Sequence, residues 1–409
     1  PRWAQLWQHS FGSLLCEMGN QGSSASRVAP ASCSTFVIAR QAKGRAIRGV
    51  NLGGWLLVEK WMNQSIFNAV DGPADSEFKL CAELGLRAQD VFQHHRETWI
   101  TKQDFVDIKH AGLESVRIPI GHWVLDIEGL SRKPYVGDRQ WIADAVCYVG
   151  PCEDYLCRAL DWARELDLTV NICLHGAPGG QSGHDHTGFS DPDWKPSMWD
   201  SASTLHCLEH IARRFGGHSA LAGISVINEP DRQISGSELC NFYSSAYETI
   251  RQHSENVVIW MPVYQRSWWW LQKSQSFPPT HWHSVAFDTH QYQCFGFPWQ
   301  RFGLKRHLEY SKTGFIHFPA VKQILDSGQL AGVTEWSLRL PEWEDSFPAK
   351  HDLAACEDRD QQYRTYASNQ MHQYDASLAW YFWSWKVDNA SEDHWDLQRC
   401  LKKGWVVLV

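Results

Sequence analysis

The sequence predicts an α/β protein whose main domain is a single (β/α)8 (TIM) barrel. Eight short apolar runs recur from about residue 45 onward, and stretches with apolar residues at three- and four-residue spacing lie between them. Apolar strands that alternate with helices are typical of a parallel sheet buried on both faces. Eight such units favour a closed barrel over an open sheet, and no glycine-rich phosphate-binding fingerprint follows the first run.

Each element is predicted from its local pattern. Short runs rich in valine, isoleucine and leucine indicate strands, and a period of 3.6 residues indicates helices. The predicted strands are Ala46–Leu52, Ser115–Pro119, Thr169–Leu174, Gly223–Asn228, Val257–Met261, Ser284–His290, Ala331–Glu335 and Leu378–Ser384. The predicted helices between them are Lys102–Ala111, Glu153–Leu166, Thr204–Phe215, Gly236–His253 and Asp358–Tyr374.

Residues 1–43 differ from the rest of the chain. The part from Asn20 to Ser34 is rich in serine, alanine and glycine and has little periodicity, which is typical of a linker or a weakly ordered arm. The chain begins at Pro1 without a signal-like segment, so we expect any targeting peptide to have been removed or to lie outside this sequence. The sequence therefore predicts a short N-terminal arm, residues 1–43, and one barrel domain, residues 44–409.

Composition narrows the classes of partner. The net charge is −8 without a basic block, which argues against nucleic acid or an anionic membrane as a partner. No apolar run approaches the ~18 residues of a membrane span. The chain has 23 tryptophans, and indole rings pack against the flat faces of sugars as well as in protein cores. We expect a monomer that binds a saccharide and has no cofactor and no metal ion.

Two further patterns bear on the cellular compartment. Cys147, Cys152 and Cys157 lie close together, which suits one or two disulfides in a secreted protein. The triplets Asn63-Gln64-Ser65 and Asn389-Ala390-Ser391 are glycosylation sequons, although one or two such triplets arise by chance in a chain of this length.

Side chains that can carry chemistry gather at the ends of the predicted strands. In a (β/α)8 barrel the active site lies at the carboxyl ends of the strands. Only the fifth predicted strand, which ends at Met261, ends without a titratable, amide or aromatic group. The side chains at the other ends are Asn51, Glu59, Arg117, His175, Asn228, Glu229, His290, Tyr292, Glu335, Trp383 and Trp385.

Two of these side chains are glutamates that directly follow β-type runs. Glu229 follows the run VIN and Glu335 follows the run GVT. Either glutamate alone could cap a helix or contact water. Two carboxylates at one end of a barrel are what a retaining glycosidase needs, because one protonates the leaving oxygen and the other attacks the sugar carbon.

Six segments around the strand ends match the motifs of a known family. They are Arg48–Glu59 (RGVNLGGWLLVE), Val116–Gly121 (VRIPIG), Leu174–Gly179 (LHGAPG), Asn228–Pro230 (NEP), Thr334–Trp336 (TEW) and Phe382–Lys386 (FWSWK). With these segments the chain resembles glycoside hydrolase family 5, and in particular its fungal exo-β-1,3-glucanase branch. The resemblance covers roughly residues 45 to 409.

The resemblance implies a role for each matching residue. Glu229 matches the acid/base, Glu335 matches the nucleophile, and Asn228 matches the residue that binds the sugar 2-hydroxyl. Glu59 matches the carboxylate that binds the glucose at the non-reducing end, and Trp383 matches the platform under the −1 sugar. The other implied substrate-binding residues are Arg117, His175, His290 and Tyr292.

The loop after the third predicted strand departs from the family pattern. The family usually has an aromatic residue and an asparagine there, whereas this chain has His184 and His186. Phe295 matches the other half of an aromatic entrance clamp. We treat all three as candidate substrate-binding residues. Metal binding by His184, Asp185 and His186 is an alternative, but a histidine pair in a loop lacks the third ligand of a committed site.

Physical chemistry gives an expectation for the pKa of each glutamate. A nucleophilic carboxylate has to stay ionised, so we expect Arg117 and Tyr292 to lower the pKa of Glu335. An acid has to hold its proton, so we expect the neighbouring carboxylate to raise the pKa of Glu229.

The resemblance implies a retaining glycoside hydrolase that releases glucose from the non-reducing ends of β-1,3-glucan, outside the cell or at the cell wall. Alternatives among enzymes are an endo-β-glucanase, a steryl glucoside or glucosylceramide hydrolase, and a transglycosylase. A non-catalytic sugar-binding barrel is a further alternative. It predicts the loss of one carboxylate or of Arg117, and this chain keeps both glutamates and the arginine.

Overall fold

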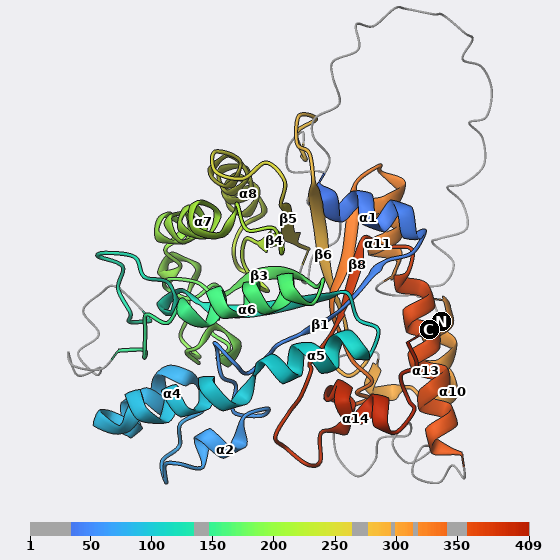
Figure 1. The fold of residues 1–409 in the computed structure, drawn as a ribbon, viewed down its shortest axis with the longest axis horizontal. Helices are drawn as coiled ribbons and strands as arrows, with labels where there is room; N and C mark the ends of the chain where they lie inside the picture. Colours follow the sequence, from blue (N-terminus) through green and yellow to red (C-terminus); the bar gives the residue numbers. More distant parts are fainter. Residues whose placement is uncertain are drawn as a thin grey trace, which may run out of the picture. The chain divides into compact units, whose positions relative to one another are not determined.

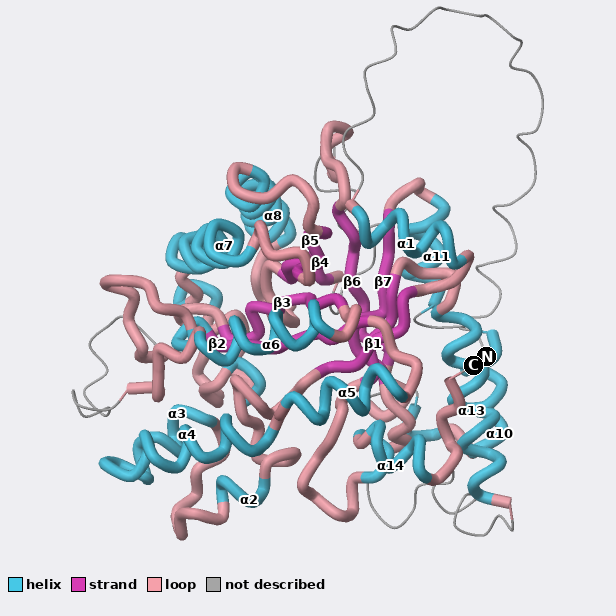
Figure 2. Tube along the Cα trace, in the orientation of Figure 1, coloured by secondary structure: helices cyan, strands magenta, loops and turns pink. Residues whose placement is uncertain are grey.

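The computed structural model describes residues 34–134, 147–263, 277–295, 299–313, 318–341 and 358–408. In these residues eight parallel strands pair in chain order, and β8 closes on β1 to complete a barrel. The strands lie at the centre of the view in Figure 1 with helices around them, and the same arrangement is coloured by element type in Figure 2. The predicted (β/α)8 barrel is confirmed.

The bounds of the elements are as follows. The strands are β1 (Ile47–Asn51), β2 (Ser115–Gly121), β3 (Thr169–Gly176), β4 (Leu221–Ser225), β5 (Val258–Pro262), β6 (Val285–Gln291), β7 (Leu330–Trp336) and β8 (Ala379–Phe382). The helices are α1 (Thr35–Lys43), α2 (Gln64–Phe67), α3 (Glu77–Leu84), α4 (Ala88–Trp99), α5 (Lys102–His110), α6 (Asp154–Glu165), α7 (Ser201–Phe215), α8 (Gly236–Arg251), α10 (Leu304–Thr313), α11 (Phe318–Asp326), α13 (Arg359–Tyr374) and α14 (Leu397–Lys402).

The fourth strand ends earlier than its apolar run predicts. The run continues to Asn228, whereas β4 ends at Ser225. The backbone N–H of Val226 still donates to the carbonyl of Trp260 at 3.1 Å, and the chain then bends. Glu229 has a φ of 40° in this bend, a conformation that residues other than glycine rarely adopt and that concentrates at functional sites.

Helix α1 occupies part of the segment that the sequence analysis assigned to the arm. Its Phe36 packs in a buried cluster with Ile47, the first residue of β1. Arg40 Nε donates to the carbonyl of Ser377, just before β8, at 3.2 Å. The helix therefore closes the amino end of the barrel, opposite the carboxyl ends of the strands. The rest of the expected arm lies outside the described residues.

The helices around the barrel bury one face each. In α6 the buried residues are Tyr155, Leu156, Ala159, Leu160 and Ala163, which recur at helical spacing. In the part of the chain that the structure describes, none of the helices combines the length and the apolar character needed to cross a membrane.

The expected disulfides are not formed within the cysteine cluster. Cys147, Cys152 and Cys157 are all free thiols in the structure. Closeness in sequence was the reason for expecting them, and closeness in sequence does not bring two sulfur atoms to bonding distance.

The barrel interior changes from bulky aromatic rings to charged groups along its axis. Toward the amino ends, Trp260 Nε1 donates to Asn171 Oδ1 at 2.9 Å, and the hydroxyls of Tyr381 and Ser115 lie 2.9 Å apart. Toward the carboxyl ends, the guanidinium of Arg117 is fully buried. The charged end is the one at which active sites of this fold are built.

Candidate active site

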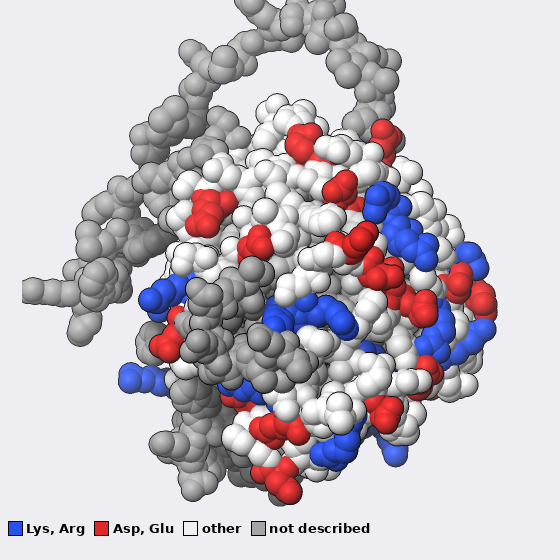
Figure 3. Space-filling view, turned by 90° about the vertical axis from the view of Figure 1, so that its left-hand side faces the viewer, with Lys and Arg blue, Asp and Glu red and all other residues white. Residues whose placement is uncertain are grey.

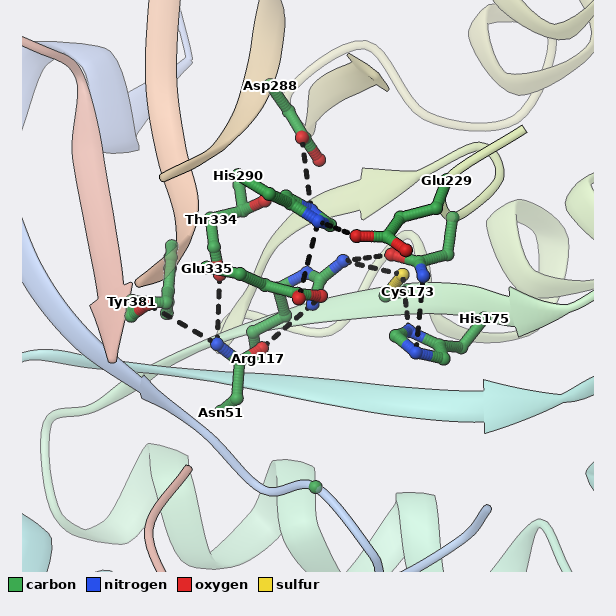
Figure 4. A network of polar contacts seen from close by, with 12 residues as sticks. Asn51, Arg117, Cys173, His175, Glu229, Asp288, His290, Thr334, Glu335 and Tyr381 are labelled. Carbon is green, nitrogen blue, oxygen red and sulfur yellow. Dashed lines mark hydrogen bonds and ion pairs between the residues drawn. The ribbon is translucent and has the colours of Figure 1, made fainter. Parts of the chain in front are cut away.

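The candidate site is organised around Arg117 of β2. The strand register places it beside Asn51 of β1, and its Nη1 donates to Asn51 Oδ1 and to Glu335 Oε1, both at 2.8 Å. Its Nη2 donates to Asn228 Oδ1 and to Cys173 Sγ, both at 3.0 Å. Figure 4 shows Asn51, Cys173 and Glu335 around the guanidinium. One buried cation thus fixes groups from several strand ends at once.

Glu335 lies near the end of β7 beside a β-bulge. The pairing of β6 with β7 shifts here, with Thr334 as the extra residue, so that Glu335 pairs with His290. Bulges of this kind redirect side chains next to active sites. Glu335 Oε1 accepts from Arg117, and Oε2 accepts from the hydroxyl of Tyr292 at 2.8 Å. Both oxygens of the carboxylate are therefore held in place.

Glu229 follows β4 and faces two histidines. Its Oε1 lies 2.6 Å from His290 Nδ1, and its Oε2 lies 3.6 Å from His186 Nε2. His290 Nδ1 is also 3.3 Å from Glu335 Oε2, so one imidazole lies between the two carboxylates (Figure 4). One oxygen of each glutamate and a nitrogen of His290 all lie within 4.8 Å of one another. Carboxyl groups are about 5–5.5 Å apart in retaining glycosidases and about 6.5–9.5 Å apart in inverting ones.

The same three groups also have the spacing of a metal site. Among the described residues, Glu229, His290 and Glu335 form the one group of three or more such side chains with donor atoms this close. The guanidinium of Arg117 already binds Glu335, and its positive charge would repel a metal cation. The chemistry of this donor set therefore suits proton transfer better than metal binding.

The pKa values of the two glutamates differ from the expected pattern. Burial raises the pKa of Glu229, but the hydrogen bond and the charge of His290 outweigh burial and bring this pKa down to about 2. Burial lowers the pKa of His290, but the charge of Glu335 and the hydrogen bond to Glu229 raise it to about 9. Burial raises the pKa of Glu335, although His290 and Arg117 act against it.

Arg117 and Tyr292 lower the pKa of Glu335 as expected, but burial outweighs them, and the expected rise in the pKa of Glu229 is wrong because His290 lowers it. The expectations treated Glu229 and Glu335 as an isolated pair and placed His290 only at the sugar. Because His290 contacts both carboxylates, it is the third titrating member of the group. His290 therefore competes with Glu229 for the proton that the resemblance assigns to Glu229.

A chain of contacts orients Asn228. Its Nδ2 donates to His175 Nε2 at 3.2 Å. Burial and the charge of Arg117 lower the pKa of His175, so the ring is neutral and can accept this bond. Trp383 stacks on His175 with ring centroids 5.5 Å apart and planes 12° apart. Gln181 Nε2 donates to the carbonyls of His175 and Asn228 at 2.6 and 2.8 Å, which fixes both from behind.

Glu59 lies in the loop after β1 and is buried. Trp61 Nε1 donates to Glu59 Oε2 at 2.9 Å. Burial raises the pKa of Glu59 well above its usual value, and the negative charges of Asp185 and Glu335 raise it further. Glu59 therefore belongs to the same electrostatic cluster as the two candidate catalytic glutamates.

An aromatic group lies beside Glu335 and ends at the surface. Phe295 is 58% exposed, and its ring centroid lies 5.5 Å from that of Tyr292 and 6.1 Å from that of Trp395. The ring of Trp395 in turn lies 5.2 Å from that of Tyr292 and 5.2 Å from that of Trp61. These rings connect the nucleophile candidate to a solvent-exposed aromatic surface.

The two loop histidines lie on the side of Glu229. The ring of His186 packs edge-on against His175 with centroids 5.8 Å apart, and its Nε2 lies 3.3 Å from Ser182 Oγ. His184 stacks on His186 with centroids 5.8 Å apart. His186 thus contacts the acid/base candidate directly, whereas His184 lies one ring farther away.

The structure brings the predicted site residues together through these contacts, and it adds others that sequence reasoning missed. Gln181 bonds the backbone carbonyls of His175 and Asn228, and Cys173 accepts from the guanidinium of Arg117. No sequence pattern predicts either contact. The high tryptophan content suggested a saccharide site, but it did not single out Trp61 or Trp395. The predicted residues are Glu59, Arg117, His175, His184, His186, Asn228, Glu229, His290, Tyr292, Phe295, Glu335 and Trp383.

Barrel, strand-end carboxylates and aromatic surroundings together define an enzyme that cleaves glycosidic bonds. The family described as "Cellulase (glycosyl hydrolase family 5)" matches residues 75–389. The chain belongs to glycosyl hydrolase family 5, as the sequence motifs indicated.

Curated relatives carry more specific names. The chain is 28% identical over 397 residues to the probable glucan 1,3-beta-glucosidase A of Aspergillus niger, covering 88% of this chain and 86% of that protein. It is 30% identical over 396 residues to the glucan 1,3-beta-glucosidase of Schwanniomyces occidentalis, with coverage of 88% and 86%. Among solved structures, the rutinosidase from Aspergillus niger is similar with a TM-score of 0.68 and 16% identity, covering 88% of this chain and 98% of that chain. This last likeness concerns the fold alone.

Proposed function

We propose that the chain is a retaining glycoside hydrolase that releases glucose from the non-reducing ends of β-1,3-glucan. Glu229 is its acid/base and Glu335 its nucleophile. The observation that carries the proposal is the group of two carboxylates and one imidazole whose donor atoms lie within 4.8 Å of one another. A water molecule does not fit between carboxylates at this spacing in the way that an inverting mechanism requires.

In the first step Glu335 attacks the anomeric carbon of the bound glucose. Arg117 and Tyr292 hold its two oxygens, so the carboxylate needs little reorientation before it reacts. The bond between the anomeric carbon and the leaving oxygen breaks, the leaving oxygen takes a proton, and a glucosyl ester forms on Glu335.

The proton for the leaving oxygen comes from the pair of His290 and Glu229. The 2.6 Å contact between His290 Nδ1 and Glu229 Oε1 lets the proton pass between them. The negative charge of Glu335 contributes to holding this proton on His290. As Glu335 becomes a neutral ester, that attraction fades, and transfer through Glu229 to the leaving oxygen becomes favourable.

In the second step water replaces Glu335 at the anomeric carbon. Glu229, now ionised, takes a proton from the attacking water, and the released Glu335 regains its charge. The restored charge draws the proton back to His290. The cycle thus ends with the protonation pattern with which it began.

The substrate proposal rests on the relatives named glucan 1,3-beta-glucosidase and on the surrounding side chains. Asn228 is oriented to meet a sugar 2-hydroxyl, and Glu59 to bind hydroxyls of the terminal glucose. Trp383 provides the platform under that sugar, and the exposed Phe295 provides a surface for the leaving side. His184 and His186 stand where the family usually has an aromatic residue and an asparagine, so we propose that the leaving side differs from that of the relatives.

We further propose that the enzyme acts as a monomer outside the cell or at the cell wall, without a nucleic-acid partner. Acidic and basic side chains are interspersed on the described surface visible in Figure 3, which offers no continuous basic track on that face. A polyanion would need such a track, whereas a neutral glucan does not.

Product analysis on laminarin tests the substrate proposal. Glucose as the sole product from the earliest time points is the expected result. Early release of longer oligosaccharides would instead indicate endo attack, and cleavage confined to lipid-linked glucosides would move the substrate to another class.

Product stereochemistry tests the mechanism separately. Proton NMR of the first product should show β-glucose, because two displacements restore the configuration. Glu335→Gln should abolish turnover while leaving the thermal unfolding temperature close to that of the unmodified enzyme. An active Glu335→Gln enzyme, or α-glucose as the first product, would refute the assignment.

A further inference from the structure

The structure gives the two glycosylation sequons very different surroundings. Asn63 is fully buried, with its Oδ1 accepting from the backbone N–H of Glu59 at 3.2 Å and its Nδ2 donating to the carbonyl of Gly54 at 3.1 Å. The hydroxyl of Ser65 donates to Asp388 Oδ2 at 2.5 Å. A sugar on Asn63 would have to break these contacts and open the loop after β1, so the folded protein has no room for it.

Asn389 has the opposite setting, in the loop between β8 and α14. It is half-buried, and the next two residues, Ala390 and Ser391, are exposed. The backbone N–H of Ser391 donates to Asn389 Oδ1 at 3.0 Å, and the hydroxyl of Ser391 donates to the same oxygen at 2.8 Å. In the described part of the chain no residue bonds Asn389 Nδ2. This is an asparagine turn, which engages the amide oxygen and leaves the amide nitrogen available.

We propose that Asn389 is an N-glycosylation site and that Asn63 is not. In the transfer, a bond forms between Asn389 Nδ2 and the anomeric carbon of an oligosaccharide carried on a lipid diphosphate. The bond from that carbon to the diphosphate oxygen breaks, the lipid diphosphate leaves with the electron pair, and Nδ2 loses one proton to a base of the transferase. The two hydrogen bonds from Ser391 polarise the amide and favour loss of that proton.

The conformation around Asn389 depends on contacts within its own loop and with α14. Besides the bonds from Ser391, the carbonyl of Asn389 accepts from Arg399 Nη1 at 2.8 Å. The turn itself spans three consecutive residues, so it can form in the nascent chain before the barrel closes. The same loop carries Trp383 and Trp395, which places the glycan on the side of the molecule that holds the candidate active site.

The test uses the full chain with a cleavable secretion signal, expressed in yeast. Ser391→Ala removes the second sequon, Ser391→Thr keeps it, and Ser65→Ala removes the first sequon without touching the buried amide of Asn63. Each protein is compared on a gel before and after treatment with an N-glycosidase, and the modified peptide is located by mass spectrometry. Where little protein is secreted, the core-glycosylated form is assayed in the same way from the cell lysate.

The expected result is a single glycan on the unmodified chain, on Ser391→Thr and on Ser65→Ala, and none on Ser391→Ala. An unmodified chain without a glycan would overturn the proposal, as would a shift that persists in Ser391→Ala. A glycan on Asn63 in secreted protein that is active on laminarin would overturn the second half of it.

Discussion

The hydroxyl of Tyr292 offers a sharp test of the role assigned to Glu335. Tyr292→Phe removes the 2.8 Å hydrogen bond to Glu335 Oε2 and keeps the ring that packs against Phe295 and Trp395. Burial and the charge of Glu335 raise the pKa of Tyr292 well above its usual value, so the hydroxyl remains a donor throughout the working pH range. The substitution therefore deletes one donor and nothing else from the site.

The size of the effect follows from the charge of the acceptor. A hydrogen bond to a charged group contributes about 1.5–3 kcal/mol. At about 1.36 kcal/mol per factor of ten, loss of this bond should lower kcat/KM by roughly 10- to 150-fold. The loss also acts on Glu335 itself, because the bond from Tyr292 lowers the pKa of that carboxylate. Without it the pKa rises, and the acid limb of the pH profile should move to higher pH.

The assay is the initial rate of glucose release from laminarin as a function of pH. Tyr374→Phe is a matched control, because it removes a buried hydroxyl that donates to Gln370 Oε1 at 3.1 Å and not to a site carboxylate. The control should affect stability but not kcat/KM. If Tyr292→Phe keeps kcat/KM within about twofold of the unmodified enzyme and its acid limb does not move, Glu335 is not the nucleophile that this contact supports.

Three further predictions concern the histidines and the acid/base. His290 has a pKa raised from 6.5 to about 9, so its contribution to stability is complete below pH 6.5 and is lost as pH rises through about 9. Between these pH values the free energy of unfolding should therefore decline less in His290→Gln than in the unmodified enzyme, by up to about 3 kcal/mol. Urea denaturation at several pH values measures this, and the same decline in both proteins would contradict the prediction. Glu229→Ala should slow laminarin hydrolysis by about 10²–10⁴-fold. The rate at which dinitrophenyl glucoside forms the glucosyl-enzyme, measured as a stopped-flow burst, should fall far less, because its leaving group needs no proton. His186→Asn should raise the pKa of Glu229, because the charge of His186 lowers it, and the change is measured by NMR titration of the Glu229 carboxyl group; an unmoved titration would show that His186 acts on substrate alone.

The barrel could be predicted from the sequence because its strands are buried on both faces. Such strands read as continuous apolar runs, and their number and order determine the topology almost alone. Helix α1 was missed because its buried residues, Phe36 and Val37, span less than one turn at the end of a serine- and alanine-rich segment. A helix of this kind is stabilised by packing against the barrel, which its own sequence does not show.

Most candidate site residues could be named from the sequence because they lie within recognisable strands or just after them. The contacts between these residues could not be predicted, since they depend on the register of neighbouring strands. The bulge at Thr334 decides that Glu335 lies beside His290, and a shift by one residue would turn the side chain to the other face. The pKa expectation for Glu229 failed for the same reason, because Coulomb interactions depend on distances that the spacing of residues along the chain does not supply.

The position of His290 links the two halves of the proposed reaction through charge. Arg117 and His290 place two positive charges among the carboxylates of Glu229, Glu335 and Asp288 in a largely buried group. Buried charges of this kind are stable only while they are paired. When Glu335 is converted to an ester, one negative charge disappears, and the pKa of His290 falls because the charge of Glu335 no longer raises it. In the proposed reaction, formation of the covalent bond and release of the proton from His290 are therefore coupled through the charge of Glu335. This coupling explains how Glu229, with its low pKa in the resting site, can still pass a proton to the leaving oxygen.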